Sequence, residues 1–400
     1  MERHDVLIIG GGLVGCGAAY YLGKRGVRAC VLERGDINRQ ASGRNAGSLH
    51  FQLEHRLIEH GDALAAQFAQ VIPLNLLAIE EWAELERELD ADLEIVLHGG
   101  LMLAETDRDV ALLEKKFALE QKWGLPTSLL SQSDVRAQAP YLDSRVVAAG
   151  YCPQEGHANP RLVTLAYARA AALRGAEIRT GVEVAAIARE GRGWRVQTKR
   201  GGVTQILYAD SILNAAGAWA GDIARRANLH LPIFPVPLTM NITEARAPMI
   251  SHFIQHAGRK LSMKQVRDGH ILIGGGWPSR FHKTHGAIDT DKTPYPVREN
   301  VVENLRTACA VVPALADCHL LRVWTGATGV TPDQLPILGE VPEAPGFYVA
   351  AGGSGFTLGP VYARLIAELI AGGAASHQID IYSPRRFSHI NSFMGSAYGA

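Results

Sequence analysis

The sequence predicts an α/β protein: a Rossmann-like domain assembled from separated parts of the chain, with an inserted α+β domain that carries an antiparallel sheet. Three observations support this fold class. A glycine-rich turn joins a strand to a helix at residues 10–15, and a second strand–glycine–helix unit covers residues 347–373. Between them, residues 232–312 hold short strands in antiparallel pairs. Antiparallel segments flanked by α/β segments are typical of one domain inserted into another.

The composition is that of an ordinary globular protein. Of 400 residues, 47% are apolar and 20% are charged, and 40 basic residues balance 40 acidic ones. This length exceeds what a single core needs, so two domains are expected. A formal charge of zero argues against a nucleic-acid partner. We see no uninterrupted apolar run of membrane-spanning length and no signal-peptide pattern, so we expect a cytoplasmic protein without a membrane span.

The cysteines give no reason to expect a metal site. Cys16, Cys30, Cys152, Cys309 and Cys318 are odd in number and widely scattered, and no C-x-x-C spacing occurs. A disulfide framework, a zinc site or an iron–sulfur site is therefore not predicted.

The first element is a strand over Val6–Ile9, whose uninterrupted apolar run is typical of a strand covered on both faces. Residues 13–22 follow with helical spacing and small residues. Gly26 ends that helix before a second strand over residues 27–32.

The turn between this strand and helix has the pattern G-x-G-x-x-G, formed by Gly10, Gly12 and Gly15. The glycines permit a tight turn, close approach of a pyrophosphate and close packing of helix against strand. Leu13 and Val14 stand at the helix N-terminus, where free N–H groups and the helix dipole favour phosphate. The turn predicts a dinucleotide site.

Glu33 strengthens this prediction because it ends the second strand, 18 residues after Gly15. A carboxylate there can accept both ribose hydroxyls of an adenosine, and it would repel a 2′-phosphate, so NADP is disfavoured. A packing turn followed by a surface glutamate is the alternative. The turn alone does not separate NAD from FAD.

The elements that follow are predicted in order along the chain. Residues 54–91 are mostly helical with an interruption near Pro73, and residues 107–123 form an amphipathic helix. A helix with proline near its start begins after Asn159. Strand-rich sequence then leads to a hairpin over residues 193–217.

The inserted region and the last unit complete the pattern. "KLSMKQV" and "HILIGGGW" form a strand pair across "RDG", and a helix is expected near residues 296–312. The last unit places Gly352, Gly353 and Gly355 before a helix. A second helix N-terminus suits a flavin, whose ring becomes negative on reduction, although an ordinary packing turn is the alternative.

These elements suggest two domains. We assign residues 1–85, 146–222 and 320–400 to a discontinuous FAD-binding domain, and residues 86–145 and 223–319 to a substrate or cap domain.

Five motifs together resemble a known family. The glycine turn with Glu33-Arg34, "SGRNAG" at 42–47, "NAAGAWA", "VWTGATGVTPDQLPILG" and "GSGFTLGP" occur in the order found in the D-amino-acid-oxidase-like FAD oxidoreductases. The resemblance runs from end to end. Within the family the chain is most similar to the β or B subunits of heteromeric amino-acid dehydrogenases: those of sarcosine oxidase, hydroxyproline dehydrogenase and opine oxidase. "ASGRNAGSLHF" points toward the last group.

The resemblance implies which residues hold the cofactor. The loop at 42–49 would wrap the pyrophosphate and one edge of the flavin, with Arg44 supplying a planar cationic donor. Val184 would contact the adenine side, the residues near 217 would line the channel, and those near 355 would face the pyrimidine end of the flavin. The implied residues are Arg34, Ser42, Arg44, Asn45, Ala46, Gly47, Ser48, Leu49, Val184, Ala216, Gly217, Trp219, Gly353, Ser354, Gly355, Phe356 and Thr357.

The chain departs from the family pattern at the expected substrate site. Simple amino-acid oxidases of the family carry an arginine in a W-x-G-x-R-P stretch to clamp the substrate carboxylate, and Thr328 stands there instead. Lys264, on a strand of the inserted domain, is a candidate replacement; a solvent-facing lysine is the alternative. His50 is a second candidate, and a structural histidine bonded to backbone is its alternative.

A second departure concerns oxygen. Oxygen-using relatives of monomeric sarcosine oxidase have a lysine in a G-F-K stretch, and this chain has Thr357 there. The cysteine attachment of flavin in that group also has no evident counterpart. The resemblance therefore implies non-covalent FAD and a poor oxygen reaction, with electrons passing to an α subunit and possibly a small third subunit.

The expected reaction is oxidation of the C–N bond of a secondary amino acid, an opine such as octopine or nopaline, or hydroxyproline. Hydride transfer to flavin would give an imine that hydrolyses. Three alternatives stay open: an oxygen-using glycine, sarcosine or D-amino-acid oxidase, an ordinary NAD-dependent dehydrogenase, and a non-catalytic FAD-binding assembly subunit.

Overall fold

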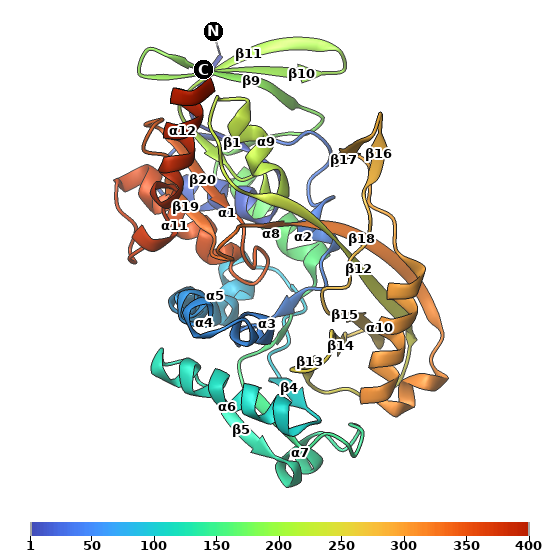
Figure 1. Ribbon diagram of the computed structural model, residues 1–400. Coiled ribbons are helices and arrows are strands. Elements are labelled where there is room, and N and C mark those ends of the chain that lie inside the picture. The colour runs from blue at the N-terminus through green and yellow to red at the C-terminus, as the bar shows by residue number, and fades with distance from the viewer. Residues whose placement is uncertain (1, 399–400) are drawn as a thin grey trace.

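Two eight-stranded sheets organise the chain, and the computed structural model describes residues 2–398 (Figure 1). The strands of the first sheet are β1 (Glu2–Ile9), β2 (Ala29–Leu32), β8 (Glu177–Arg179), β9 (Glu183–Glu190), β10 (Gly193–Arg200), β11 (Val203–Asn214), β19 (Ile337–Glu340) and β20 (Phe347–Ala351). They follow the order β19-β20-β11-β1-β2-β8, and β9 and β10 continue from β11 as an antiparallel meander.

The middle of the first sheet is parallel, as its apolar runs predict. β1 pairs in parallel with β2 and β11, which places Ile9 beside both Leu32 and Asn214. β20 then pairs in parallel with β11, so a strand from near residue 350 lies next to one that ends at residue 214. Alternate residues of β1 face two separate cores: Ile8 packs on one side and Leu7 on the other.

The helices include all those that the sequence predicts, and others at residues 41–44, 132–138, 220–225 and 388–398 that it does not predict. They are α1 (Leu13–Lys24), α2 (Ala41–Arg44), α3 (His55–Glu59), α4 (Asp62–Ala69), α5 (Ile72–Leu89), α6 (Asp107–Lys122), α7 (Gln132–Gln138), α8 (Pro160–Leu173), α9 (Ala220–Arg225), α10 (Arg298–Val311), α11 (Gly359–Gly372) and α12 (Ser388–Tyr398). Proline falls in the first turn of both α5 and α8, where its missing N–H leaves no intrahelical bond unmade. α1 packs between α8 and α11 on one face of the first sheet.

The second sheet is mostly antiparallel. Its strands are β4 (Gly100–Ala104), β5 (Ser128–Ser131), β6 (Ala148–Cys152), β12 (Phe234–Ala245), β13 (Phe253–His256), β14 (Ser262–Gln265), β15 (His270–Gly274) and β18 (Leu320–Val330). The order is β18-β12-β15-β14-β13-β4-β6-β5, and the predicted pairing of β14 with β15 is present. β13 and β4 are parallel neighbours. The predicted fold class is confirmed.

Two strands lie outside the domain to which the sequence assigned them. β6 and β18 fall within the ranges predicted for the FAD-binding domain, but both belong to the second sheet. β18 pairs along its whole length with β12, and Figure 1 shows this pair running from beside α9 to α10 at the far side of the molecule. The division into two domains stays a proposal, and these strands argue for moving its boundaries past residues 152 and 330.

One helical stretch needs comment because of its composition. Residues Asp62–Leu89, which include α4 and α5, are the one helix in the described part of the chain that is long and apolar enough to cross a membrane by length and composition. Its most apolar window is 44% buried within the protein. Leu74, Ala78 and Trp82 point into the main core, so packing accounts for its apolar character.

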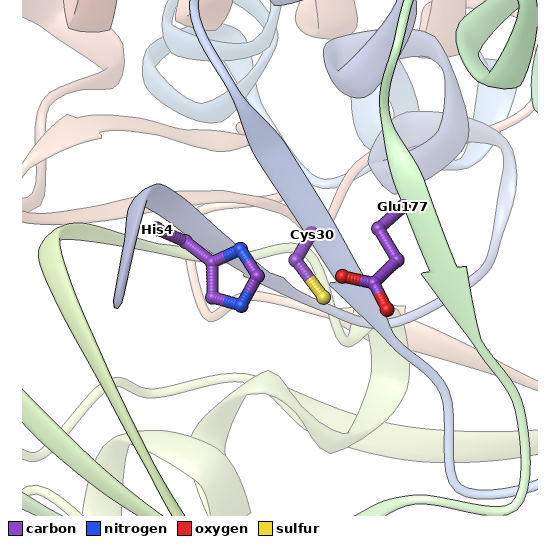
Figure 2. Close-up of side chains that lie close together, drawn as sticks. All are labelled: His4, Cys30 and Glu177. Atoms are coloured by element: carbon purple, nitrogen blue, oxygen red, sulfur yellow. The ribbon is translucent and has the colours of Figure 1, made fainter. Parts of the chain in front are cut away.

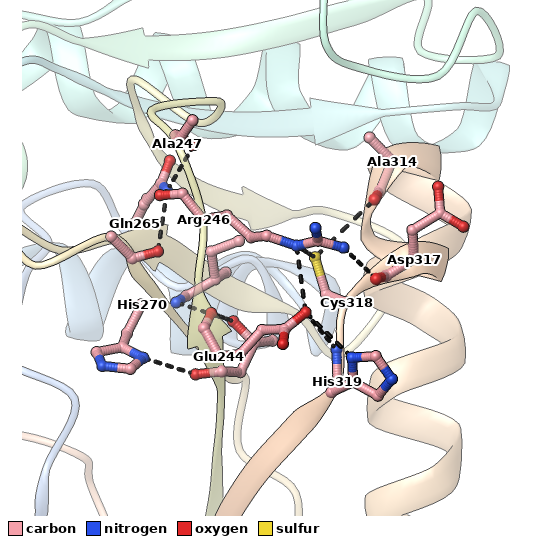
Figure 3. Close-up of polar contacts among 12 residues, drawn as sticks. Glu244, Arg246, Ala247, Gln265, His270, Ala314, Asp317, Cys318 and His319 are labelled. Atoms are coloured by element: carbon pink, nitrogen blue, oxygen red, sulfur yellow. Dashed lines mark hydrogen bonds and ion pairs between the residues drawn. The ribbon is translucent and has the colours of Figure 1, made fainter.

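A polar cluster closes the outer end of the second sheet (Figure 3). Arg246 Nε donates to Cys318 Sγ at 3.3 Å and lies 3.3 Å from Glu244 Oε1, while Glu244 also accepts from His319. His270 Nδ1 lies 2.8 Å from the Thr243 carbonyl oxygen. These contacts tie the end of β12 to the segment after α10.

Candidate active site

A cavity of about 810 Å³ lies between the first sheet and the β12–β18 pair. Its wall includes the carboxyl ends of β1, β2, β11 and β20, and it continues to Leu238 and Met240 on β12. Crevices at the carboxyl ends of parallel strands are where open α/β sheets bind ligands. The cavity contains most of the residues that the sequence predicts for the cofactor.

The glycine turn at the start of α1 leaves no room for side chains. Gly10 has φ +114°, and a Cβ there would lie 2.5 Å from the Ala215 carbonyl oxygen. A Cβ on Gly15 would lie 2.0 Å from the Gly10 carbonyl oxygen. Gly12 is the N-cap of α1 and offers no side chain, so the helix start stays open toward the cavity. Leu13 N–H donates to Ser42 Oγ at 3.0 Å.

Glu33 lies in the cavity wall and organises the backbone around it. Its Oε2 accepts from Gly11 N–H at 2.7 Å, and its Oε1 accepts from Gly35 N–H at 2.8 Å. An ionised carboxylate has about four acceptor positions, so two backbone bonds leave capacity for ribose hydroxyls. The geometry is compatible with the role predicted for Glu33.

The "SGRNAG" segment is more ordered than the open polar loop that its sequence suggests. Residues 41–44 form the short helix α2, and the Asn45 side chain closes the turn after it. Asn45 Nδ2 donates to the carbonyls of Ala41 and Ser42, and its Oδ1 accepts from Gly47 N–H at 2.6 Å. The polar residues of this motif fold the loop as well as face the cavity.

Two arginines lie at the mouth of the cavity. Arg34 Nη1 is 2.6 Å from Asp291 Oδ1, and its guanidinium lies 4.8 Å from the centre of the Trp219 ring. Arg44 donates to the Arg39 carbonyl and to Thr293 Oγ1 at 3.2 Å. Both arginines thus connect the nucleotide-side loops to residues 291–293.

The segment at residues 352–357, here called the second glycine corner, is hydrogen-bonded to the 42–49 loop; the first glycine corner is the turn at residues 10–15. Thr357 Oγ1 donates to the Ser48 carbonyl at 3.2 Å and lies 3.5 Å from His50 Nδ1. Trp82 Nε1 donates to the Thr357 carbonyl at 2.6 Å. Gly353 has φ +61°, a backbone conformation that favours glycine. The two glycine corners therefore face one cavity from opposite parts of the chain.

The predicted site residues divide into those in the wall and those behind it. The cavity wall contains Gly10, Gly12, Leu13, Val14, Glu33, Arg34, Ser42, Arg44, Asn45, Ala46, Ser48, His50, Val184, Ala216, Gly217, Trp219, Thr328, Gly353, Ser354, Gly355, Phe356 and Thr357. Four predicted residues do not line it: Gly15, Gly47, Leu49 and Lys264. Gly15 and Gly47 allow close backbone packing, and Leu49 is core.

Lys264 is buried rather than solvent-facing, so that alternative is wrong. Its side chain is 2% exposed, and Nζ donates to Ser48 Oγ at 2.7 Å. Burial lowers the pKa of Lys264 to about 7.

His50 and Glu54 lie together in the cavity wall, close to Ser48 along the chain. His50 Nε2 lies 3.6 Å from Glu54 Oε1, and its ring stands edge-on to Phe253. Thr328 reaches the same cavity from β18, where it pairs with Val236.

The donor set of this cavity fits FAD. An open helix N-terminus suits a pyrophosphate, a strand-end carboxylate suits a ribose, and the glycines form a cradle that a Cβ would fill. The second corner offers a place for the other end of the same ligand. A volume of about 810 Å³ falls in the range of ligand sites.

Comparison with known proteins agrees with this geometry. A family model described as FAD dependent oxidoreductase matches residues 5–369. The chain belongs to the FAD dependent oxidoreductase family. FAD is accordingly its cofactor, and the NAD-dependent alternative is set aside.

Individual members of this family resemble the chain over nearly all of its length. Glycine oxidase of Geobacillus kaustophilus is 28% identical, covering 92% of this chain and 93% of its own. The B subunit of opine oxidase from Rhizobium meliloti is 27% identical, covering 97% and 98%. The crystal structure of L-proline dehydrogenase from P. horikoshii superposes with a TM-score of 0.82 at 26% identity, covering 97% and 98%.

A buried polar network behind this flavoenzyme cavity was not predicted. Glu155 Oε1 accepts from the N–H groups of Phe51 and Gln52, and its Oε2 accepts from Gln52 Nε2 at 2.8 Å. Glu120 accepts from Leu53 N–H at 2.7 Å. Burial raises the pKa of Glu155, and hydrogen bonds from Gln52 oppose that shift. The one signal in the sequence was Gln52, a polar residue between two apolar ones.

A separate group of possible ligand atoms lies near the amino ends of β1, β2 and β8, away from the cavity (Figure 2). His4, Cys30 and Glu177 bring their ligand atoms within 4.8 Å of one another. Arg179 already donates to both Glu177 oxygens, at 2.7 and 2.8 Å. Burial raises the pKa of the Cys30 thiol to about 12, which disfavours the thiolate that binds metal. We assign no metal to this group.

Proposed function

We propose that this flavoenzyme oxidises the C–N bond of a secondary amino acid, an opine such as octopine or nopaline, or hydroxyproline. We further propose that it is the catalytic β subunit of a heteromeric cytoplasmic dehydrogenase. The similarity to the B subunit of opine oxidase, which covers 97% of this chain and 98% of that relative, supports both statements.

The observation that carries the proposal is an imidazole and a carboxylate side by side in the wall, close to Thr357. His50 and Glu54 lie together there, with the apolar side chains of Leu238 and Met240 elsewhere in the same cavity. An opine presents carboxylates, a secondary amine and a second polar arm. His50 is the candidate donor for carboxylate at this position, and Glu54 is an acceptor for ammonium or guanidinium.

When bound, FAD supplies the hydride acceptor for the carbon next to nitrogen. The chain's own contribution is to bind and orient the amino acid. Thr328 offers one hydrogen bond in place of the arginine clamp of simple oxidases, and His50 is the candidate that shares recognition of the carboxylate. The imine product then hydrolyses in water.

A dehydrogenase is favoured over an oxidase by the charges near the second corner. Thr357 supplies a hydroxyl where a fixed cation would favour the superoxide-like state formed as oxygen takes an electron. Lys264 lies nearby, but its lowered pKa leaves a neutral amine above about pH 7. Electrons would therefore pass to an α subunit, and FAD would be held non-covalently.

The test is anaerobic bleaching of the flavin absorption by octopine, nopaline, hydroxyproline, sarcosine and glycine, with and without partner subunits. We expect the secondary amino acids with a second polar arm, or hydroxyproline, to bleach fastest. If none of these compounds bleaches the flavin, the proposal is wrong and a non-catalytic FAD-binding assembly subunit is favoured.

An oxygen-using glycine or sarcosine oxidase is the second candidate, favoured by the 28% identity to glycine oxidase. Hydrogen peroxide formation in air separates the two. Peroxide produced as fast as an artificial dye is reduced would identify an oxidase.

A further inference from the structure

Two lysines are buried among the described residues, and their surroundings differ in charge. Lys116 is 1% exposed, and its Nζ lies 2.7 Å from Glu120 Oε1 and 2.8 Å from Gln52 Oε1. Lys264 is 2% exposed, and its one hydrogen bond among the described residues is the 2.7 Å contact with Ser48 Oγ. A buried ammonium without a carboxylate is strongly disfavoured, so Lys264 is suited to be a neutral amine where Lys116 is an ion-pair partner.

Among the described residues, Lys264 has an aromatic ring beside it and no ion-pair partner. Its Nζ lies 5.6 Å from the centre of the Phe253 ring on β13, and none of the ion pairs among the described residues includes it. His157 on β7 (Gly156–His157) interacts with it electrostatically, and burial lowers the pKa of His157 to about 3, so this ring is neutral. Further ionisable groups of this region are His98, which also interacts electrostatically with His157, His50, which follows β3 (Ser48–Leu49), and Glu155, which precedes β7.

Ser48 connects this amine to the cavity. Ser48 is one of the residues of the cavity wall, and its hydroxyl oxygen is hydrogen-bonded to Lys264 Nζ. Lys264 itself does not line the wall, so a direct ion pair with a substrate carboxylate is not what the geometry offers. In the 2.7 Å contact the amine is the donor, but a neutral amine has a lone pair, so the Ser48 hydroxyl can also donate to Lys264 Nζ. Ser48 Oγ can then accept a proton from a ligand while its own proton passes to the amine.

We propose that Ser48 and Lys264 form a proton relay that deprotonates the substrate's secondary ammonium before its C–H bond is cleaved. The inference rests on the proposed function. The substrate N–H⁺ gives its proton to Ser48 Oγ while the Ser48 hydroxyl proton passes to Lys264 Nζ. The substrate becomes a neutral amine and Lys264 an ammonium, and no electrons are exchanged in this step. The proton returns to water in the cavity through Ser48.

The deciding experiment is the pH profile of the anaerobic bleaching rate at saturating substrate. We expect the wild-type rate to rise with an apparent pKa near that of the buried amine. In Lys264→Met and in Ser48→Ala, the rise should move toward the pKa of the free substrate ammonium, with the rate at pH 7 falling about a hundredfold. Lys264→Ala should recover part of its rate when ethylamine is added.

Lys116→Met is the matched control, because it removes the other buried lysine. We expect it to lower the melting temperature without moving the pH profile. If Lys264→Met weakens only substrate affinity and leaves the limiting rate and its profile unchanged, the relay is wrong and a carboxylate anchor takes its place.

A second readout needs no substrate. The folded pKa of Lys264 lies below its ordinary value of 10.5, so the unfolded chain holds one more proton between about pH 7 and 10. The wild-type melting temperature should therefore rise relative to Lys264→Met across this window, and a parallel course would contradict a neutral Lys264. Failure of the wild type to bleach with any amino acid would remove the proposed function and the relay together. Bleaching with an unmoved profile in Lys264→Met would remove the relay alone.

Discussion

At the scale of single residues, the cavity depends on positions where a side chain cannot fit. Gly10→Ala puts a Cβ 2.5 Å from the Ala215 carbonyl oxygen at φ +114°. We expect the free energy of unfolding to fall by at least about 2 kcal/mol and FAD retention to be lost, because the turn must move away from the position at which we expect it to bind phosphate. Chemical unfolding and the flavin-to-protein absorbance ratio measure the two effects.

Gly372→Ala is the control for this substitution. Gly372 ends α11, has no heavy atom within 4 Å of an added Cβ and does not need a positive φ. Alanine there should leave FAD content unchanged and stability equal or up to about 0.5 kcal/mol higher. Equal losses in both variants would show that the turn at Gly10 has no special constraint.

Sequence patterns predict site residues best where the fold accepts only one type of residue at a position. Gly10, Gly12 and Glu33 were predicted from their spacing and their strand–turn–helix context, and all three line the cavity. The sequence could not decide whether Lys264 is buried, because a lysine on a short strand has the same sequence context whether it faces solvent or Ser48. Only the packing of β14 against β3 and β13 distinguishes these cases.

At the scale of elements, the extended segment at residues 50–53 is held by carboxylates instead of a strand partner. Glu155 receives two backbone N–H groups and the Gln52 amide. Glu155→Gln would set its amide nitrogen against that of Gln52, which cannot turn over without losing its bond to Lys116. We expect a loss of about 2 kcal/mol in urea unfolding.

The matched control for this prediction is Glu84→Gln. Glu84 belongs to an exposed ion pair with Arg87 on α5, and such pairs contribute little. A Glu155→Gln protein as stable as Glu84→Gln would mean that the network does not support the segment.

Elements with local signals were predicted well, and those set by distant partners were not. α6 and α10 follow from the spacing of their apolar residues, and the Thr106 capping box starts α6 where predicted. The placement of β6 and β18 depends on strands far away in the chain, and no residue within them reveals the sheet they join. The short helix α2 was missed because Asn45 closes it with side-chain bonds instead of an apolar face.

At the scale of the whole molecule, one ligand is expected to bridge both glycine corners. FAD should raise the melting temperature of the apoprotein, by an amount equivalent to about 2.7 kcal/mol at a free concentration a hundred times Kd. FMN lacks the adenosine half, so at the same concentration it should give a clearly smaller shift. Differential scanning calorimetry measures both, and equal shifts would contradict binding at two corners.

The pairing of β20 with β11 has a consequence for how the protein is made. The two glycine corners are separated by most of the chain, and the wall at residues 350–357 exists only after β20 has joined the sheet. Nearly the whole polypeptide must therefore emerge from the ribosome before the FAD site is complete. Nascent chains stalled before residue 347 should therefore bind no FAD, even when FAD is present in excess.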